Sequence, residues 1–174
     1  MKLKTPKGFT LLELLVVLAL IGILTGIGLA SFTSAQVRAR DSQRKAELKV
    51  IASVLEAYFQ KNKEYPNSSS GSCGANVGWF CSATGDNWIP NFAPTYIKTL
   101  PKDRLNNGNL ICQPSPENNT NASLTYAYRS TGAPPKQYLL VAKLENQNDG
   151  DSGKPVRFGN STLTYPGCFA ITNP

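Results

Sequence analysis

Near the start of the chain, 24 consecutive residues (14–37) carry no charged side chain. The first part of this run, residues 14–24, is aliphatic throughout except for Gly22. As an α-helix the run would extend about 36 Å, which is enough to cross a bilayer core of about 30 Å. A core helix of a soluble domain has one apolar stripe, whereas this run is apolar on every side. The sequence therefore predicts a membrane-spanning helix.

A single acid, Glu13, stands at the beginning of this run. A carboxylate costs about 2.5–3.5 kcal/mol at the centre of a membrane helix and less near its end. Such an acid indicates a functional site and requires a partner. A cleaved secretory signal is the main alternative, because lysines precede the run and Gly28-Leu29-Ala30 fits a cleavage site. Glu13 and the unbroken helical pattern beyond Ala30 argue against that alternative.

The segment Lys7-Gly8-Phe9-Thr10-Leu11-Leu12-Glu13-Leu14 closely resembles the prepilin processing motif of type IV pilins and type II secretion pseudopilins. In that family a prepilin peptidase cleaves after the glycine on the cytoplasmic side and methylates the new N-terminal residue. The resemblance implies cleavage between Gly8 and Phe9, methylation of Phe9, and a role for Glu13 in filament assembly. The partners it implies are further copies of the chain or minor pilins, the prepilin peptidase, an inner-membrane assembly platform and membrane lipid.

Cleavage after Gly8 would give Glu13 a partner of opposite charge, the new amine of Phe9. The helix dipole favours a negative charge in the first turn, and helical side chains lean back toward the N-terminus. Within one subunit the two groups would form an intrahelical pair. Between subunits, Glu13 of one chain could neutralise Phe9 of its neighbour, and the family resemblance favours this second role. Gly22 and Gly26 have the spacing that allows membrane helices to approach closely.

The helical pattern continues beyond the apolar run. Apolar residues recur at three- and four-residue spacing over 48–59, which predicts an amphipathic helix ending near Asn62, ahead of Pro66. Charged residues follow the apolar run at once, and we interpret them as a solvated helix face near lipid headgroups. They are Arg38, Arg40, Asp41, Arg44, Lys45 and Glu47.

Four parts are predicted: a leader (1–8), a transmembrane or filament-core helix (9–37), its amphipathic extension (38–62) and a globular β-rich domain (63–174). The fold class is α+β, and it resembles the pilin architecture, in which a long helix packs on a small antiparallel sheet. Residues 67–91 are rich in Ser, Gly and Asn, and we expect a surface loop anchored by Trp79 and Trp88. The clearest strands are 124–129 and 137–144, joined as a hairpin. Weaker candidates are 110–112, 156–158 and 168–171.

The four cysteines all follow the helix. An even number without metal-type spacing indicates disulfides in an oxidising compartment, although buried free thiols are an alternative. Three connectivities are possible, and we favour Cys73–Cys81 with Cys112–Cys168. We therefore expect a cytoplasmic N-terminus and an extracytoplasmic globular domain, which later joins a surface or periplasmic filament.

Other chemistry has little support in the sequence. The chain has no histidine, which excludes His-based catalysis, and we expect no enzymatic activity. Loss of the leader would leave 15 basic against 11 acidic residues, too small an excess to predict dedicated nucleic-acid binding. Asp149 and Asp151 are calcium candidates in an acidic loop, as in major pseudopilins. The loop lacks EF-hand spacing, because Arg157 is twelfth from Asn146, so an ordinary turn without a cofactor is favoured.

The sequence thus predicts a structural filament subunit that polymerises through its N-terminal helix. It does not distinguish a surface pilus subunit from a major pseudopilin of a type II secretion system or a competence pseudopilin. An alternative of a different class is a membrane-anchored extracytoplasmic binding domain that never polymerises.

Overall fold

The structure is a computed structural model that describes residues 8–114 and 119–173, without the side chains of residues 27–30 and 120. The predicted leader therefore lies outside the described residues except for Gly8. The chain divides between Arg38 and Ala39 into two compact units. This division falls close to the predicted end of the apolar run.

Helix α1 (Leu11–Asn62) begins in the first unit and ends in the second. The expectation was a helix from residue 9 to about 62, so the beginning differs by two residues. The reason is local, because Thr10 caps the first turn and is not part of the helix. At the other end, Lys63 adopts a left-handed conformation (φ 59°) and its amide donates to Phe59. This geometry is a common way for a helix to end.

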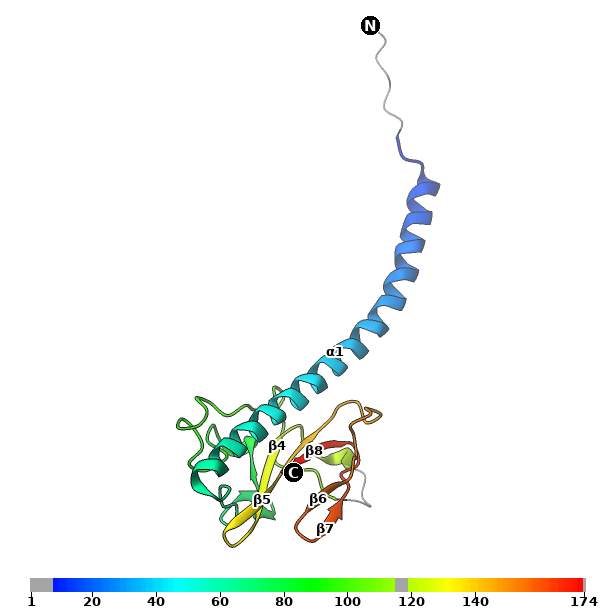
Figure 1. Ribbon diagram of the computed structural model, residues 1–174. Helices are drawn as coiled ribbons and strands as arrows, with labels where there is room; N and C mark the ends of the chain where they lie inside the picture. Colours follow the sequence, from blue (N-terminus) through cyan, green and yellow to red (C-terminus); the bar gives the residue numbers. More distant parts are fainter. Residues whose placement is uncertain (1–7, 115–118, 174) are drawn as a thin grey trace. The chain divides into compact units, whose positions relative to one another are not determined.

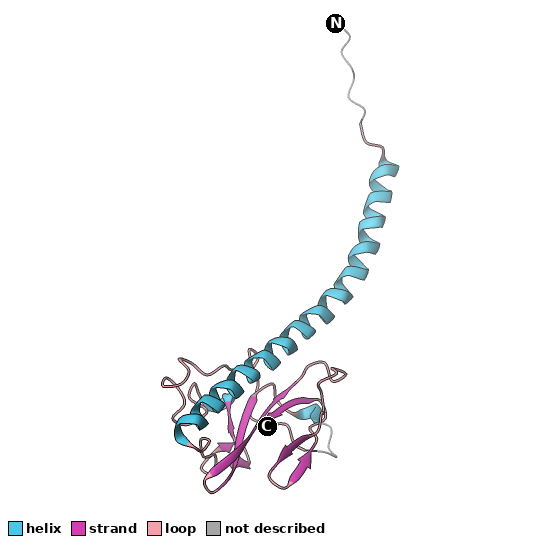
Figure 2. Ribbon diagram, viewed as in Figure 1, coloured by secondary structure: helices cyan, strands magenta, loops and turns pink. Residues whose placement is uncertain are grey.

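Eight short strands follow the helix in the described part of the chain, and the longest two form the hairpin that the sequence predicts. In chain order they are β1 (Ser72–Cys73), β2 (Asn76–Val77), β3 (Phe80–Cys81), β4 (Tyr126–Gly132), β5 (Pro135–Lys143), β6 (Val156–Phe158), β7 (Ser161–Leu163) and β8 (Cys168–Thr172). The main sheet is antiparallel with strand order β3-β4-β5-β8, and β1–β2 and β6–β7 form separate two-stranded sheets (Figure 2). The α+β prediction is therefore confirmed.

One face of the main sheet packs against the second half of α1 (Figure 1). The helix contributes its buried apolar positions, Leu48, Ile51 and Leu55, as its periodicity predicts. The sheet contributes alternate residues of the hairpin, among them Tyr126 and Tyr128. Successive strand residues point to opposite faces, so the same strands have a second set of buried side chains on the other face.

The second face of the sheet is covered by irregular segments. Ala127, Leu139 and Val141 point to this side, where they join all four cysteines in a second core cluster. Trp79 belongs to this cluster and Trp88 to the first, so both tryptophans are buried in the core. Their expected role as anchors of the loop is confirmed.

Several strand predictions need correction. Residues 110–112 do not form a strand, because this segment is held at Ser123, whose amide donates to the Leu110 carbonyl. The expected loop 67–91 contains β1, β2 and β3, which are two residues long each and show no alternation for the sequence to reveal. The predictions for β6 and β8 are confirmed to within one residue.

Candidate assembly site and its anchoring network

The first turn of α1 carries the predicted processing and assembly residues. Phe9 is 85% exposed, and a Cβ built on Gly8 would meet none of the described atoms within 4 Å. The peptide bond between them is thus unobstructed by the described part of the chain. Their roles as the cleavage and methylation residues stay predictions.

Glu13 is engaged with Thr10. Its carboxylate accepts hydrogen bonds from the Thr10 amide and hydroxyl, each at 2.9 Å, while its own amide donates to the Thr10 hydroxyl at 3.2 Å. This is the reciprocal arrangement of a capping box, which satisfies amides that the first turn leaves without helical partners. The Glu13 side chain thus leans back toward the N-terminus, as expected, and contacts Thr10. In the unassembled chain, the carboxylate is already satisfied locally.

The helix beyond Glu13 presents an unpartnered apolar surface within its own unit. Among the described residues, α1 is the one helix whose length and apolar composition suffice to cross a membrane, and no residue of its most apolar stretch is buried. Gly22 and Gly26 belong to this stretch, and a Cβ at either would meet no described atom within 4 Å. Thr25 lies between them, and its hydroxyl donates a hydrogen bond to the Ile21 carbonyl at 2.7 Å. The hydroxyl therefore has a partner within its own helix.

The charged segment after the apolar run is only partly solvated, contrary to its interpretation as a solvated face: Arg38 is exposed, whereas Asp41 and Arg44 are buried. Asp41 is 0% exposed and Arg44 is 3% exposed. Arg44 Nη1 lies 2.7 Å from Asp41 and 2.7 Å from Glu145, and its Nε donates to Asp103. Burial acts to lower the pKa of Arg44, but these carboxylates outweigh burial and raise that pKa above its ordinary value. The guanidinium is therefore a permanently charged centre inside the globular unit.

The same segment holds the loop between β5 and β6. Asp41 accepts hydrogen bonds from the amides of Glu145 (3.0 Å) and Asn146 (2.8 Å). Arg40 forms a bidentate salt bridge with Glu145, in which Nε and Nη2 donate to the two carboxylate oxygens at 2.8 and 2.6 Å. The hydrogen bonds from Arg40 and then Arg44 lower the pKa of Glu145 to about 2. The helix is thus fastened to the sheet by ionic contacts as well as by its apolar face.

The sequence could have given a partial signal for this network. Asp41 and Arg44 have opposite charges three positions apart, which places them on one helix face. Their partners Asp103 and Glu145 lie far along the chain, and no local pattern relates them to the helix. Sequence analysis therefore missed the site because its contacts are long-range.

The two calcium candidates are brought together with a lysine. Lys45 Nζ lies 2.9 and 3.0 Å from the carboxylate oxygens of Asp149 and 3.0 Å from Asp151. The contact with Lys45 lowers the pKa of Asp149. Lys154 and then Lys45 lower the pKa of Asp151 to about 2. Among the described residues, no group of three or more His, Cys, Asp or Glu side chains is arranged to hold a metal ion.

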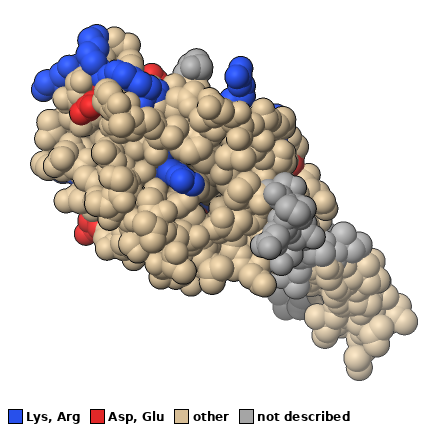
Figure 3. Space-filling view, turned by 90° about the horizontal axis from the view of Figure 1, so that it is seen from below, with Lys and Arg blue, Asp and Glu red and all other residues tan. Residues whose placement is uncertain are grey.

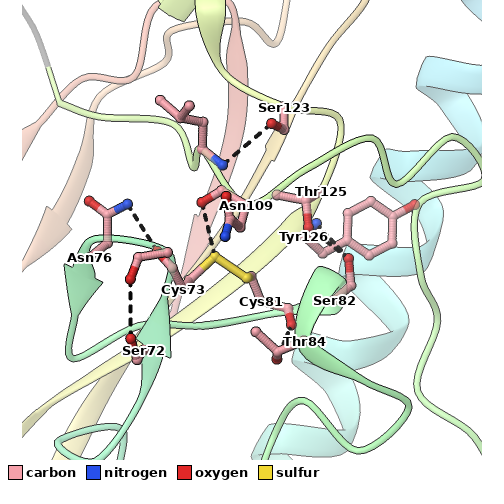
Figure 4. Close-up of a disulfide and its surroundings, with 12 residues drawn as sticks. Ser72, Cys73, Asn76, Cys81, Ser82, Thr84, Asn109, Ser123, Thr125 and Tyr126 are labelled. Atoms are coloured by element: carbon pink, nitrogen blue, oxygen red, sulfur yellow. Dashed lines mark hydrogen bonds between the residues drawn. A yellow bond between two sulfur atoms is a disulfide. The ribbon is translucent and has the colours of Figure 1, made fainter.

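Two disulfides hold the irregular segments behind the sheet. They join Cys73 to Cys81 and Cys112 to Cys168, which is the pairing that the sequence favoured. Figure 4 shows the first of them beside Asn109, whose carbonyl oxygen lies 3.3 Å from the Cys73 sulfur, and Ser82, whose hydroxyl accepts from the Tyr126 amide. The second ties β8 to the segment that follows Leu110. Both crosslinks are typical of an oxidising compartment.

Figure 3 shows that one face of the globular unit is mostly uncharged, with lysine and arginine side chains mainly along one edge and a basic side chain near its middle. A surface groove of about 490 Å³ lies between the tips of the β4–β5 and β6–β7 hairpins, and Thr131, Lys136, Gln137 and Asn160 line it. Gln137 crosses it by accepting a hydrogen bond from the Gly159 amide at 2.7 Å.

The N-terminal segment of the chain is similar to known proteins. A family described as the prokaryotic N-terminal methylation motif matches residues 3–29. The type IV major pilin protein PilA of Myxococcus xanthus is 37% identical over 59 residues, which are 34% of this chain and 27% of that protein. A fimbrial protein of Pseudomonas aeruginosa is 31% identical over 68 residues, 39% of this chain and 44% of its own length.

One of these matches is long enough to extend well beyond the helix. The type II secretion system core protein G of Pseudomonas aeruginosa is 29% identical over 107 residues, which are 62% of this chain and 73% of that protein. The match to the Myxococcus pilin, in contrast, spans about a quarter of that relative's length. No solved structure shows a significant match to the chain.

Proposed function

We propose that this chain, a member of the type IV pilin and type II secretion pseudopilin family, is a structural subunit of a type IV pilus-like filament. The observation that carries the proposal is the methylation motif over residues 3–29, joined to a helix whose most apolar stretch has no buried residue. A helix of this kind is stable in lipid or in a filament core made of its own copies.

The proposed sequence of events begins in the membrane. The leader remains on the cytoplasmic side, a prepilin peptidase cleaves after Gly8, and Phe9 receives the methyl group. The globular domain lies on the extracytoplasmic side, where its two disulfides form. An inner-membrane assembly platform then extracts the subunit and adds it to the filament.

Glu13 selects the docked position in this proposal. In the single chain it is satisfied by Thr10. On docking, it exchanges this neutral partner for the amine of Phe9 on a neighbouring subunit, and a charge pair in a low-dielectric core is stronger than a neutral hydrogen bond. The exchange penalises misplaced subunits, because an unpaired buried charge is costly.

A major pseudopilin of a type II secretion system is the second candidate. It is supported by the similarity to the core protein G, which extends past the helix into the globular domain and covers 73% of that relative. The two candidates share processing and polymerisation and differ in the filament, since a pseudopilus is short and a pilus extends from the cell.

The experiment that tests the proposal is microscopy of filaments sheared from the producing cells, with antibodies against the globular domain. We expect labelled filaments in the wild type and their loss when the gene is deleted. Long labelled surface filaments support the pilus, and labelled filaments that appear only on overproduction support the pseudopilus. Labelled protein that stays in the membrane fraction under both conditions would instead support a non-polymerising anchored domain.

A further inference from the structure

We propose that Lys45 is the resident cation of the acidic loop 145–153, and that its ammonium takes the place between Asp149 and Asp151 that a divalent metal ion would otherwise fill. The loop would then be ordered without calcium. The inference concerns the globular unit alone and does not depend on filament formation.

The geometry of the ammonium carries the first step. Lys45 Nζ has three carboxylate oxygens within 3.0 Å, two from Asp149 and one from Asp151. An ammonium has three hydrogens to donate, so these three contacts use its full capacity. The side chain is 16% exposed, and water is largely kept from the pair. A charge-assisted contact of this kind is stronger than a hydrogen bond between neutral groups.

The local charge balance carries the second step. The two carboxylates face two ammonium groups, because Lys154 Nζ also lies 2.6 Å from Asp151. Two negative charges are thereby neutralised by two positive charges from the chain itself. A calcium ion requires six to eight oxygen ligands and would have to displace Lys45 from both carboxylates. Lys45 and Lys154 together supply two positive charges, as a divalent metal ion would, and they do not need six to eight oxygen ligands.

The remaining contacts of the loop show what this cation orders. The Asp151 amide donates to the Asp149 carboxylate at 2.9 Å, and the Ser152 amide donates to the Asp149 carbonyl at 2.9 Å. Both ends are fixed separately, by Asp41 at Glu145 and by the Gly153 amide, which donates to the Cys168 carbonyl at 3.0 Å. The middle of the loop, in contrast, contacts the helix through Lys45. Loss of the ammonium should therefore loosen the middle of the loop while both ends hold.

Hydrogen exchange of the full-length chain in detergent tests this inference, measured by mass spectrometry on peptides covering 145–153. Lys45→Met keeps most of the length of the side chain and removes the charge, and Lys45→Arg keeps the charge. Lys49→Met is the matched control, since Lys49 is an exposed lysine one turn further along the same helix. Each protein is measured in EGTA and in about 1 mM CaCl2, a concentration at which extracellular calcium modules are occupied.

We expect wild-type exchange in the loop to be the same in EGTA and in CaCl2. In EGTA, exchange should accelerate about tenfold in Lys45→Met, a factor within the range of one charge-assisted hydrogen bond. Lys45→Arg and Lys49→Met should stay within about twofold of wild type, because both keep a cation at position 45. Two results would overturn the inference. One is stronger protection of the wild-type loop in calcium than in EGTA, and the other is equal protection in Lys45→Met and Lys49→Met.

Discussion

Arg44 on helix α1 donates a hydrogen bond from Nε to the carboxylate of Asp103, a residue 59 positions further along the chain. The side chains are 3% and 1% exposed. Asp41, one helical turn before Arg44, provides a second buried carboxylate at 2.7 Å. This pairing brings the segment between β3 and β4 onto the helix and makes the guanidinium a central support of the globular unit.

Replacing Arg44 by methionine should cost about 3–5 kcal/mol of unfolding free energy, because it leaves Asp41 and Asp103 as buried charges without a cation. Arg104→Met is the matched control, since Arg104 is exposed beside Asp103, and its cost should be within about 0.5 kcal/mol. Denaturant unfolding of the full chain in detergent measures both, with the buried Trp79 and Trp88 as fluorescent reporters. Equal stability of the two variants would show that the buried network is not a support.

Acid should weaken the globular unit through Glu145. Its pKa is lowered to about 2 in the folded chain from its ordinary value of 4.5, with the hydrogen bond from Arg40 as the main cause. The folded state therefore gains stability from ionised Glu145 above about pH 4.5, and that gain disappears as the pH falls toward 2. Glu145→Gln removes the titrating group. Its melting temperature should lie below that of wild type at neutral pH, and the difference should shrink between pH 4.5 and 2.

The control for this titration is Glu64→Gln, at an exposed glutamate just after the helix. Its melting temperature should follow that of wild type across the same range. A difference between wild type and Glu145→Gln that stays constant down to pH 2 would contradict the role of the Arg40–Glu145 pair.

The two disulfides should contribute unequally. In the chain-entropy description, the Cys112–Cys168 link, with a sequence separation of 56, stabilises by about 4 kcal/mol, and the Cys73–Cys81 link, with a separation of 8, by about 2.5 kcal/mol. Replacing both cysteines of each pair by serine and measuring urea unfolding compares them. If the Cys73–Cys81 variant is the less stable one, local packing around Trp79 outweighs loop length.

The helix, the hairpin and the Cys73–Cys81 link could be predicted because each has a local signal. The periodicity of Leu48, Ile51 and Leu55 defines the buried face of the helix, and the alternation around Tyr126 and Tyr128 indicates a strand. The end of α1 near Asn62 followed from the proline shortly after it.

The ionic network could not be predicted in the same way. Arg44 and Lys45 are basic residues on a helix just beyond an apolar span, and on sequence grounds their expected environment is water. Their burial follows from Asp103, Glu145 and Asp149, which the fold brings to the helix from distant loops. The short strands β1, β2 and β3 were not predicted for a related reason. A strand of two residues is too short to show an alternation of apolar and polar residues.

Glu13→Gln separates the two roles of Glu13. The amide oxygen of glutamine can still accept from Thr10 and preserve the cap, but it carries no charge to pair with the amine of Phe9. We expect normal membrane insertion and loss of at least about 90% of filament mass, because one buried charge would remain unpaired at every subunit contact. Quantitative blotting of sheared material measures this loss.

Thr25→Val is the control for this experiment, because Thr25 is another polar residue of the same helix and bonds only to its own Ile21 carbonyl among the described contacts. It should form filaments at the wild-type level. Filaments of normal abundance from Glu13→Gln would mean that Glu13 acts as a helix cap and not as a charge partner.

The central claim is that this chain is a processed pilin-like subunit whose N-terminus is created by cleavage. Intact-mass and peptide mass spectrometry of the chain purified from producing cells measures this most directly. The account predicts a chain that begins at Phe9 with one methyl group on its amine. A chain that retains residues 1–8, or that begins near Ser31 after a signal-peptide cut, would contradict it.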